Sequence, residues 1–384
     1  MAVIALTNAR LILPDAVVEG SVVFEDGAIV AAGPSVIAPA SAETIDASGL
    51  YVAPGFIDIH VHGGGGLSLI TDDPEQIRAY ARWVVSRGVT SFLISTFGAD
   101  HESTLRNLRG SGAALRAPTG DARPLGFHLE GPFLNPKRKG AFPESALRPP
   151  HTQEFRAYAE AAGGAIRQVT LAPELPGAHD LVRAVLDAGA VPAMGHTDAT
   201  YEEARRAFDL GVRHVTHCYN AMRPLAHRDP GCLGAALTSD QVTCELICDG
   251  AHVHPAVAEL LLRAKGVDRT VLVTDGMTLA GTGEGLLEWE GGRIEVKGLA
   301  AVRDDGTIVG SVATMDDLVR NAVRWLPVSL SEAVRMATLN PARVIGEEGR
   351  GIIEPGAAAD LVLLDDDLRV VTTFVAGTVV YRRE

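Results

Sequence analysis

The chain has 384 residues, of which 47% are hydrophobic and 21% charged, and 34 Lys+Arg against 48 Asp+Glu give a net charge of −14. This composition excludes a disordered or fibrous protein and disfavours a nucleic-acid partner, which would need a basic face. No apolar run reaches the roughly 18 residues of a membrane helix, the first residues lack the basic region of a signal peptide, and the four Cys follow no zinc or disulfide pattern, so we expect a cytoplasmic protein with no membrane partner.

Both ends of the chain carry short apolar or alternating runs separated by turn residues, the pattern of β-strands. At the N-terminal end these runs are 3–6, 10–13, 21–24 and 28–31, and at the C-terminal end they are 361–364, 370–375 and 379–381. Neither piece is long enough to build a two-sheet core alone. We therefore predict one small β-sandwich domain formed by 1–53 and 348–384, with the rest of the chain inserted into it.

The middle of the chain alternates short apolar runs with helical patterns, which is typical of parallel βα units. The eight runs are 56–59, 91–94, 125–128, 168–171, 191–194, 213–216, 243–247 and 270–274. Helices are expected between them at 74–87, 179–188, 200–208 and 255–265. We predict that 54–347 form a (β/α)₈ TIM-like barrel. An open doubly wound sheet is the alternative, but it would more often carry a Gly-rich nucleotide turn where this chain has histidines.

Groups that bind metals follow several of these runs. They are His60, His62, Glu130, His196, His217 and Asp275. The ends of parallel barrel strands meet at one rim, so we expect a metal site there, and imidazole with carboxylate suits zinc, iron or another first-row divalent ion. The fourth run lacks the Lys that often bridges two metals in such barrels. Glu130 would therefore bridge two ions, or it would share one ion with two of the histidines and leave a position open for water.

Two further features bear on the substrate. His252 follows the seventh run, where we expect it to contact substrate; a further metal ligand and a plain surface residue are the alternatives. Arg223, His227 and Arg228 form a short basic segment after the sixth run, which in a chain of charge −14 suits an anionic group such as phosphate.

The motifs HVHG at 60–63, HLEGPF at 128–133, GHT at 195–197, TH at 216–217 with NAM at 220–222, and TDG at 274–276 occur in one order along the chain. In this set the protein resembles the N-acetylglucosamine-6-phosphate deacetylases of the amidohydrolase superfamily. The resemblance covers nearly the whole chain and implies hydrolysis of the acetamide of N-acetylglucosamine 6-phosphate by a metal-activated water. It also implies a homodimer and one or two divalent ions per subunit, zinc above all, with iron, cobalt and manganese as the alternatives.

The resemblance also implies roles for individual residues. Glu130, His196 and His217 match the common metal ligands, whereas His60 and His62 match a second-metal pair that only some members keep. Asp275 matches the acid/base that takes a proton from water and returns it to the sugar nitrogen. The substrate-contacting positions are Ala141, Asn220, Ala221, Arg228, His252, Ile308, Val309 and Gly310. Among these, Asn220, Ala221 and Arg228 match phosphate-side contacts, with the Arg supplied across the dimer interface. The stretch 308–310 matches a loop near the sugar, and Phe142 stands where some members carry a His, so the sugar contacts beside Ala141 stay open.

Two other classes of function are weighed against this one. Another amidohydrolase, either a cyclic-amide hydrolase or a nucleobase deaminase, is disfavoured by the missing Lys and by the HLEGP segment respectively. A catalytically silent barrel that serves as a scaffold would typically have lost ligands, whereas here every ligand position is filled.

Overall fold

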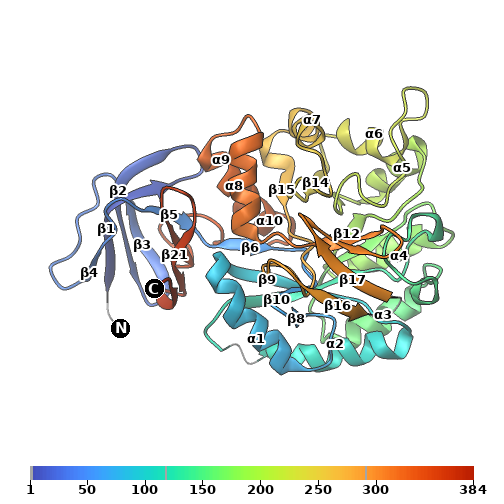
Figure 1. The fold of residues 1–384 in the computed structure, drawn as a ribbon, viewed down its shortest axis with the longest axis horizontal. Helices are drawn as coiled ribbons and strands as arrows, with labels where there is room; N and C mark the ends of the chain where they lie inside the picture. The colour runs from blue at the N-terminus through green and yellow to red at the C-terminus, as the bar shows by residue number, and fades with distance from the viewer. Residues whose placement is uncertain (1–2, 117–118, 290–291) are drawn as a thin grey trace.

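The computed structural model describes residues 3–116, 119–289 and 292–384. Within these ranges no helix has both the length and the apolar character needed to cross a bilayer. The fold is a (β/α)₈ barrel with a small β domain built from both ends of the chain, so the first and the last described strands lie in the same domain (Figure 1).

The small domain is one eight-stranded sheet in the order β22-β21-β20-β5-β1-β2-β3, with β4 paired to β1. Its strands are β1 Ile4–Ile12, β2 Val17–Glu25, β3 Ala28–Gly33, β4 Glu43–Asp46, β5 Tyr51–Pro54, β20 Leu361–Leu364, β21 Val370–Val375 and β22 Thr378–Arg382. Strand β20 pairs antiparallel with β5, so the two ends of the chain join in the middle of the sheet. The domain boundaries of 1–53, 54–347 and 348–384 stay predictions.

The sheet curls back upon itself around its own core. Phe24 on β2 and Phe374 on β21 are four positions apart in the strand order, yet their ring centroids are 5.7 Å apart. Four strand spacings in a flat sheet would separate them by about 19 Å. Both rings are almost fully buried, so the curl gives a two-layered core to a domain that neither terminus could form alone.

One expectation about this domain was wrong. The separate runs 3–6 and 10–13 form the single strand β1, and Asn8 lies within it rather than in a turn. Asn8 has φ 57°, and the register against β2 shifts between Leu6 and Ala9. Asn tolerates this left-handed conformation, so the chain forms a bulge and continues as a strand.

Eight parallel strands form the barrel, in the order β15-β14-β13-β12-β11-β10-β9-β6. They are β6 Phe56–Asp58, β9 Val89–Thr96, β10 Arg123–Glu130, β11 Ile166–Leu171, β12 Val191–Met194, β13 His214–Val215, β14 Thr243–Leu246 and β15 Thr270–Leu272. Each overlaps one predicted run. The barrel closes just beyond the first and last strands, where His62 N donates to Gly276 O and Asp275 N donates to His60 O, both at 2.8 Å. This closure brings the first and eighth strand ends together.

Helices cover the outside of the barrel (Figure 1). They are α1 Pro74–Val84, α2 His101–Arg116, α3 Thr152–Ala161, α4 Ala178–Asp187, α5 Tyr201–Leu210, α6 Gly231–Leu237, α7 Pro255–Lys265, α8 Met315–Trp325, α9 Leu330–Met336 and α10 Leu339–Val344, with short 3₁₀ turns η1 Val85–Arg87, η2 Pro136–Arg138, η3 Glu144–Ala146 and η4 Val267–Arg269. Local caps define their ends: Asp73 caps α1 before its Pro, and Thr200 and Glu203 form a capping box on α5.

A further antiparallel sheet follows the last barrel strand and was not predicted. Its strands are β16 Leu286–Trp289, β17 Gly292–Lys297, β18 Ala300–Arg303 and β19 Ile308–Ser311, and a two-stranded ribbon of β7 Gly63–Gly64 and β8 Leu67–Ser68 follows the first barrel strand. Residues 308–310, expected as a loop, therefore lie in strand β19. Met277 and Val309 pack in the small core that attaches this sheet to the end of β15.

Candidate metal centre and active site

A cavity of about 300 Å³ lies at the carboxyl ends of the barrel strands. Its lining includes five predicted ligand or acid/base residues, namely His62, Glu130, His196, His217 and Asp275. It also includes seven predicted substrate contacts, namely Ala141, Asn220, Ala221, His252, Ile308, Val309 and Gly310. The other lining residues are Phe97, Gly140, Phe142 and Met277. The structure thus brings together at one cavity residues that are more than 240 positions apart in the chain.

The first cluster of ligand-type groups is Glu130, His196 and His217, all of them buried. Glu130 Oε1 lies 3.1 Å from His196 Nε2 and 3.0 Å from His217 Nε2, and the two ring nitrogens are 3.0 Å from each other. Two imidazole nitrogens and one carboxylate oxygen therefore point at a common position, which is the arrangement that a divalent ion needs.

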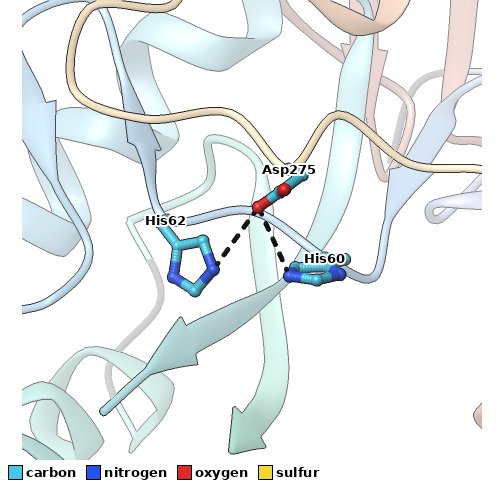
Figure 2. Close-up of side chains that lie close together, drawn as sticks. All are labelled: His60, His62 and Asp275. Atoms are coloured by element: carbon cyan, nitrogen blue, oxygen red, sulfur yellow. Dashed lines mark ion pairs between the residues drawn. The ribbon is translucent and has the colours of Figure 1, made fainter. Parts of the chain in front are cut away.

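The second cluster is His60, His62 and Asp275 (Figure 2). Asp275 Oδ1 lies 3.5 Å from His60 Nε2 and 3.6 Å from His62 Nε2, and both imidazole rings approach the same carboxylate (Figure 2). Glu130 connects the two clusters, because its Oε2 lies 2.9 Å from His62 Nε2 while its Oε1 faces the first cluster.

One buried atom tests whether these residues fit a metal. His60 Nε2 is buried and has no hydrogen-bond partner within the part of the chain that the structure describes. It lies 3.5 Å from Glu130 Oε1 and 3.5 Å from Asp275 Oδ1, too far for a hydrogen bond to either. An unpaired buried nitrogen costs about 1–3 kcal/mol, a cost that a coordinated cation removes. The donor set of imidazoles and carboxylates therefore fits a first-row divalent ion.

Backbone geometry aims these side chains at the cavity. His196, His217 and Asp275, each at the end of a barrel strand, have positive φ values of 46°, 26° and 47°. Non-glycine residues in such conformations cost on the order of 1–3 kcal/mol each and persist only where the surroundings hold them. Two main-chain hydrogen bonds stabilise this conformation of Asp275: its N donates to His60 O at 2.8 Å, and Ser311 N donates to its O at 2.9 Å.

Glu130 is an ionised carboxylate in this environment. Burial alone would raise its pKa, but the charge of His60 and the hydrogen bonds from His196 and His217 outweigh burial and hold the pKa of Glu130 well below its usual value. A charged carboxylate surrounded by imidazoles is the electrostatic complement of a cation shared with those imidazoles.

His252 lines the cavity, and a hydrogen bond to Asp249 orients its ring. Its Nδ1 is 2.7 Å from Asp249 Oδ2, and Asp249 also accepts hydrogen bonds from the His252 backbone N–H at 2.8 Å and from Ser311 Oγ at 2.8 Å. Burial lowers the pKa of His252, but the hydrogen bond and charge of Asp249 outweigh it, so the pKa is raised. The pair can present a cationic donor to the cavity.

The basic segment lies apart from the cavity that its own chain forms. Arg228 and His227 are exposed and do not line the cavity, whereas Asn220 and Ala221, which precede the segment, do. Arg223 forms an ion pair with Asp229, so its charge is largely compensated. Within one chain, therefore, the predicted phosphate contacts Asn220 and Ala221 reach the cavity and Arg228 does not.

Sequence reasoning missed one residue close to the centre. Glu245 lies in the apolar strand β14, is fully buried, and contacts His60 and the backbone of His217. The signal that was available is its residue type, because a carboxylate inside a buried apolar strand is rare unless it is paired.

Comparison with known proteins agrees with this site. The amidohydrolase family matches residues 51–380. The N-acetylglucosamine-6-phosphate deacetylase of Bacillus subtilis (strain 168) is 37% identical over 332 residues, which cover 85% of this chain and 84% of that one. The N-acetylgalactosamine-6-phosphate deacetylase of Escherichia coli O157:H7 is 36% identical over 353 residues, 92% of each chain. A structure of an Asp-to-Ala mutant of the N-acetyl-D-glucosamine-6-phosphate deacetylase from Mycobacterium smegmatis, in complex with N-acetyl-D-glucosamine-6-phosphate, matches with a TM-score of 0.93 at 35% identity. The match covers 99% of this chain and 100% of that one.

These matches, together with the ligand-type residues at the barrel rim, define the class of the protein. The chain belongs to the amidohydrolase family of metal-dependent hydrolases. Within it, the chain belongs with the N-acetylglucosamine-6-phosphate deacetylases, in agreement with the resemblance seen in its motifs. The relatives favour neither a cyclic-amide hydrolase, nor a nucleobase deaminase, nor a silent scaffold.

Proposed function

We propose that the protein hydrolyses the acetamide of N-acetyl-D-glucosamine 6-phosphate to D-glucosamine 6-phosphate and acetate. The observation that carries the proposal is that the first cluster, His62 and Asp275 of the second cluster, and the predicted sugar-side residues line one cavity. His60, the remaining member of the second cluster, is fully buried and does not line the cavity. The relatives named above carry this substrate class in their names, and one was solved with the phosphorylated sugar bound.

Glu130, His196 and His217 would hold one divalent ion, and His60, His62 and Asp275 would hold a second, with Glu130 between them. We propose zinc, with iron, cobalt and manganese as alternatives. When bound, such an ion lowers the pKa of a water ligand and polarises a carbonyl oxygen.

The protein's own groups handle the protons. Asp275 takes the proton of the attacking water and then delivers it to the sugar nitrogen, because an amine leaves more readily when protonated. His252, backed by Asp249, donates a hydrogen bond to the oxygen on which negative charge develops. No protein nucleophile is needed for this route.

We propose that Asn220 and Ala221 bind the phosphate end of the substrate and that Arg228 reaches the cavity of a partner subunit in a homodimer. The exposure of Arg228 outside its own cavity supports this arrangement. A charge-assisted hydrogen bond from Arg to phosphate contributes about 1.5–3 kcal/mol, which corresponds to roughly 10- to 150-fold in KM. The dimer and the cytoplasmic location expected from the sequence both stay predictions.

The sugar-side wall decides which amino sugar is preferred. Ala141 and residues 308–310 line it, and Phe142 packs edge-on against His196 with ring centroids 5.2 Å apart. Phe142 lines the cavity with an apolar ring at the position where some members of the family carry a His. The relative from Escherichia coli O157:H7 is named for the N-acetylgalactosamine phosphate, so both epimers belong in the test.

The deciding experiment measures acetate release by zinc-loaded protein from N-acetylglucosamine 6-phosphate, N-acetylgalactosamine 6-phosphate and unphosphorylated N-acetylglucosamine. We expect turnover of the glucosamine phosphate and little from the unphosphorylated sugar. Arg228→Ala should raise KM with kcat nearly unchanged. Equal turnover of phosphorylated and unphosphorylated sugar would contradict the phosphate site, and no acetate from any of them with metal bound would contradict the deacetylase.

A further inference from the structure

Glu245 on β14 is fully buried and is not part of the cavity lining. Its Oε2 lies 2.8 Å from His60 Nδ1 and accepts a 2.8 Å hydrogen bond from the backbone N–H of His217. Its Oε1 accepts hydrogen bonds from Gln168 Nε2 at 2.9 Å and from the ring of His214 at 3.0 Å. These partners come from three other strands or their ends, so the carboxylate lies inside the barrel. An ionised carboxylate accepts about four hydrogen bonds, and four donors surround this one.

We propose that Glu245 is a positioning residue that orients one ligand in each metal cluster, an inference that rests on the proposed metal-dependent function. A metal-binding His commonly donates its other ring N–H to a carboxylate, which fixes the tautomer and the ring plane. A His must be neutral to bind a metal ion, and when a neutral His60 donates its Nδ1–H to Glu245 the lone pair is on Nε2. That atom is the unpaired one that faces Glu130 and Asp275.

The second contact of Glu245 acts on the other cluster through the main chain. His217 has φ 26°, a conformation that costs energy and that needs support from its surroundings. Its backbone N–H donates to the same Oε2 that holds His60. One carboxylate oxygen therefore fixes a ring in the second cluster and a strand-end turn in the first, and so sets the spacing between the clusters.

His128, another buried polar residue near His60, packs against the His60 ring without forming a hydrogen bond to it. His128 lies against His60 with ring centroids 4.5 Å apart, but its ring nitrogens are bonded to Ser95 Oγ at 2.9 Å and Thr170 Oγ1 at 2.8 Å. It therefore supports the position of the His60 ring by contact without holding either of its nitrogens. Glu245 differs because it bonds a nitrogen of the ligand itself.

The test is metal affinity, which does not depend on which substrate the enzyme takes. Glu245→Gln keeps the shape but offers one acceptor oxygen in place of two and removes the charge. We expect the affinity for Zn²⁺, measured by competition with a chromophoric chelator, to fall about 10- to 100-fold for at least one bound ion. The visible spectrum of the Co²⁺-loaded variant should also change, since the ligand geometry changes. A role confined to stability would move neither readout.

Asp316→Asn on α8 is the matched control. Asp316 is also a buried carboxylate, bonded by Thr314 at 2.6 Å and by Arg320 at 3.0 Å, and it does not line the cavity. The same acid-to-amide change there should lower thermal stability and leave metal affinity and the Co²⁺ spectrum unchanged.

Gln168→Met keeps the inference testable if Glu245→Gln does not fold. Gln168 Oε1 has no hydrogen-bond partner among the described residues, so this change removes only the bond to Glu245. A smaller loss of Zn²⁺ affinity in this variant would support the inference. Wild-type affinity and spectrum in every folded variant at 245 and 168 would overturn it and leave the deacetylase proposal standing. A wild-type protein that binds Zn²⁺ tightly but releases no acetate would overturn only the proposed function, and one that binds no Zn²⁺ would overturn both.

Discussion

Replacing Asp275 by Asn separates catalysis from folding in one step. The backbone of Asp275 is held by hydrogen bonds of 2.8 Å to His60 O and 2.9 Å from Ser311 N, and neither involves the carboxylate. Asn also tolerates the left-handed φ of 47° better than most residues. The side-chain shape is nearly unchanged, so we expect the free energy of unfolding to change by about 1 kcal/mol at most.

The catalytic loss should be much larger. The amide cannot accept the proton of the attacking water, and general acid–base catalysis contributes about 10²- to 10⁴-fold. The barrier therefore rises by roughly 3–5 kcal/mol and kcat falls by the same two to four orders of magnitude. Asp275 is also one oxygen donor of the second cluster, whereas the first cluster is complete without it. Binding of the sugar phosphate and of one metal ion should persist.

The assay compares acetate release, substrate binding by calorimetry and bound zinc per chain in the wild type, Asp275→Asn and the remote Asp316→Asn. The expected pattern is a kcat at least a hundredfold lower in Asp275→Asn, with an unfolding midpoint near that of the wild type. A variant that kept more than a tenth of wild-type kcat would refute the assignment of Asp275 as proton acceptor. A collapse of kcat together with loss of substrate binding would refute the argument that the geometry survives.

Three other expectations follow from the structure. Burial lowers the pKa of His252, but Asp249 raises it by a larger amount, so a step that needs protonated His252 is lost as pH rises through the raised pKa. Asp249→Asn should therefore move the alkaline limb of the kcat/KM profile to lower pH. An unmoved limb would contradict the role given to the Asp249–His252 pair. Gly310→Ala should lower kcat/KM at least tenfold, because at φ +63° the added Cβ would lie 2.2 Å from Met277 Cγ and 2.7 Å from the backbone oxygen of Asp275. Gly306→Ala is the control, since Gly306 has φ +83° but nothing within 4 Å of the added Cβ, so it tests whether backbone strain alone has this effect. Phe374→Ala should destabilise the curled sheet by about 3–5 kcal/mol in chemical denaturation while kcat stays the same, and a large loss of kcat would mean that the small domain shapes the cavity.

The barrel was predictable because most of its strands lie in short, largely apolar and largely buried runs, and such runs stand out from the helical patterns between them. The four-stranded sheet 286–311 was not predicted. It is built from short hairpins whose side chains alternate between a small core and solvent, as Ile294 and Lys297 do, and charged residues interrupt every apolar stretch. Short strands of this kind carry a weak sequence signal, and what fixes them is their docking on Met277 and its neighbours.

The ligand-type residues could be anticipated because the rule that predicts them is local: parallel strands end at one rim, and each candidate is at or just beyond the end of its own run. Glu245 obeys a different rule. It lies inside its strand, and its partners are the side chains that meet it across the closed barrel. The spacing of residues along the chain does not predict which side chains these are. Its burial in an apolar run implies that it must be paired, since an unpaired buried carboxylate costs too much to be kept. Sequence reasoning can therefore predict that such a residue has donors around it, but only the closure of the barrel determines that two of those donors belong to His60 and His217.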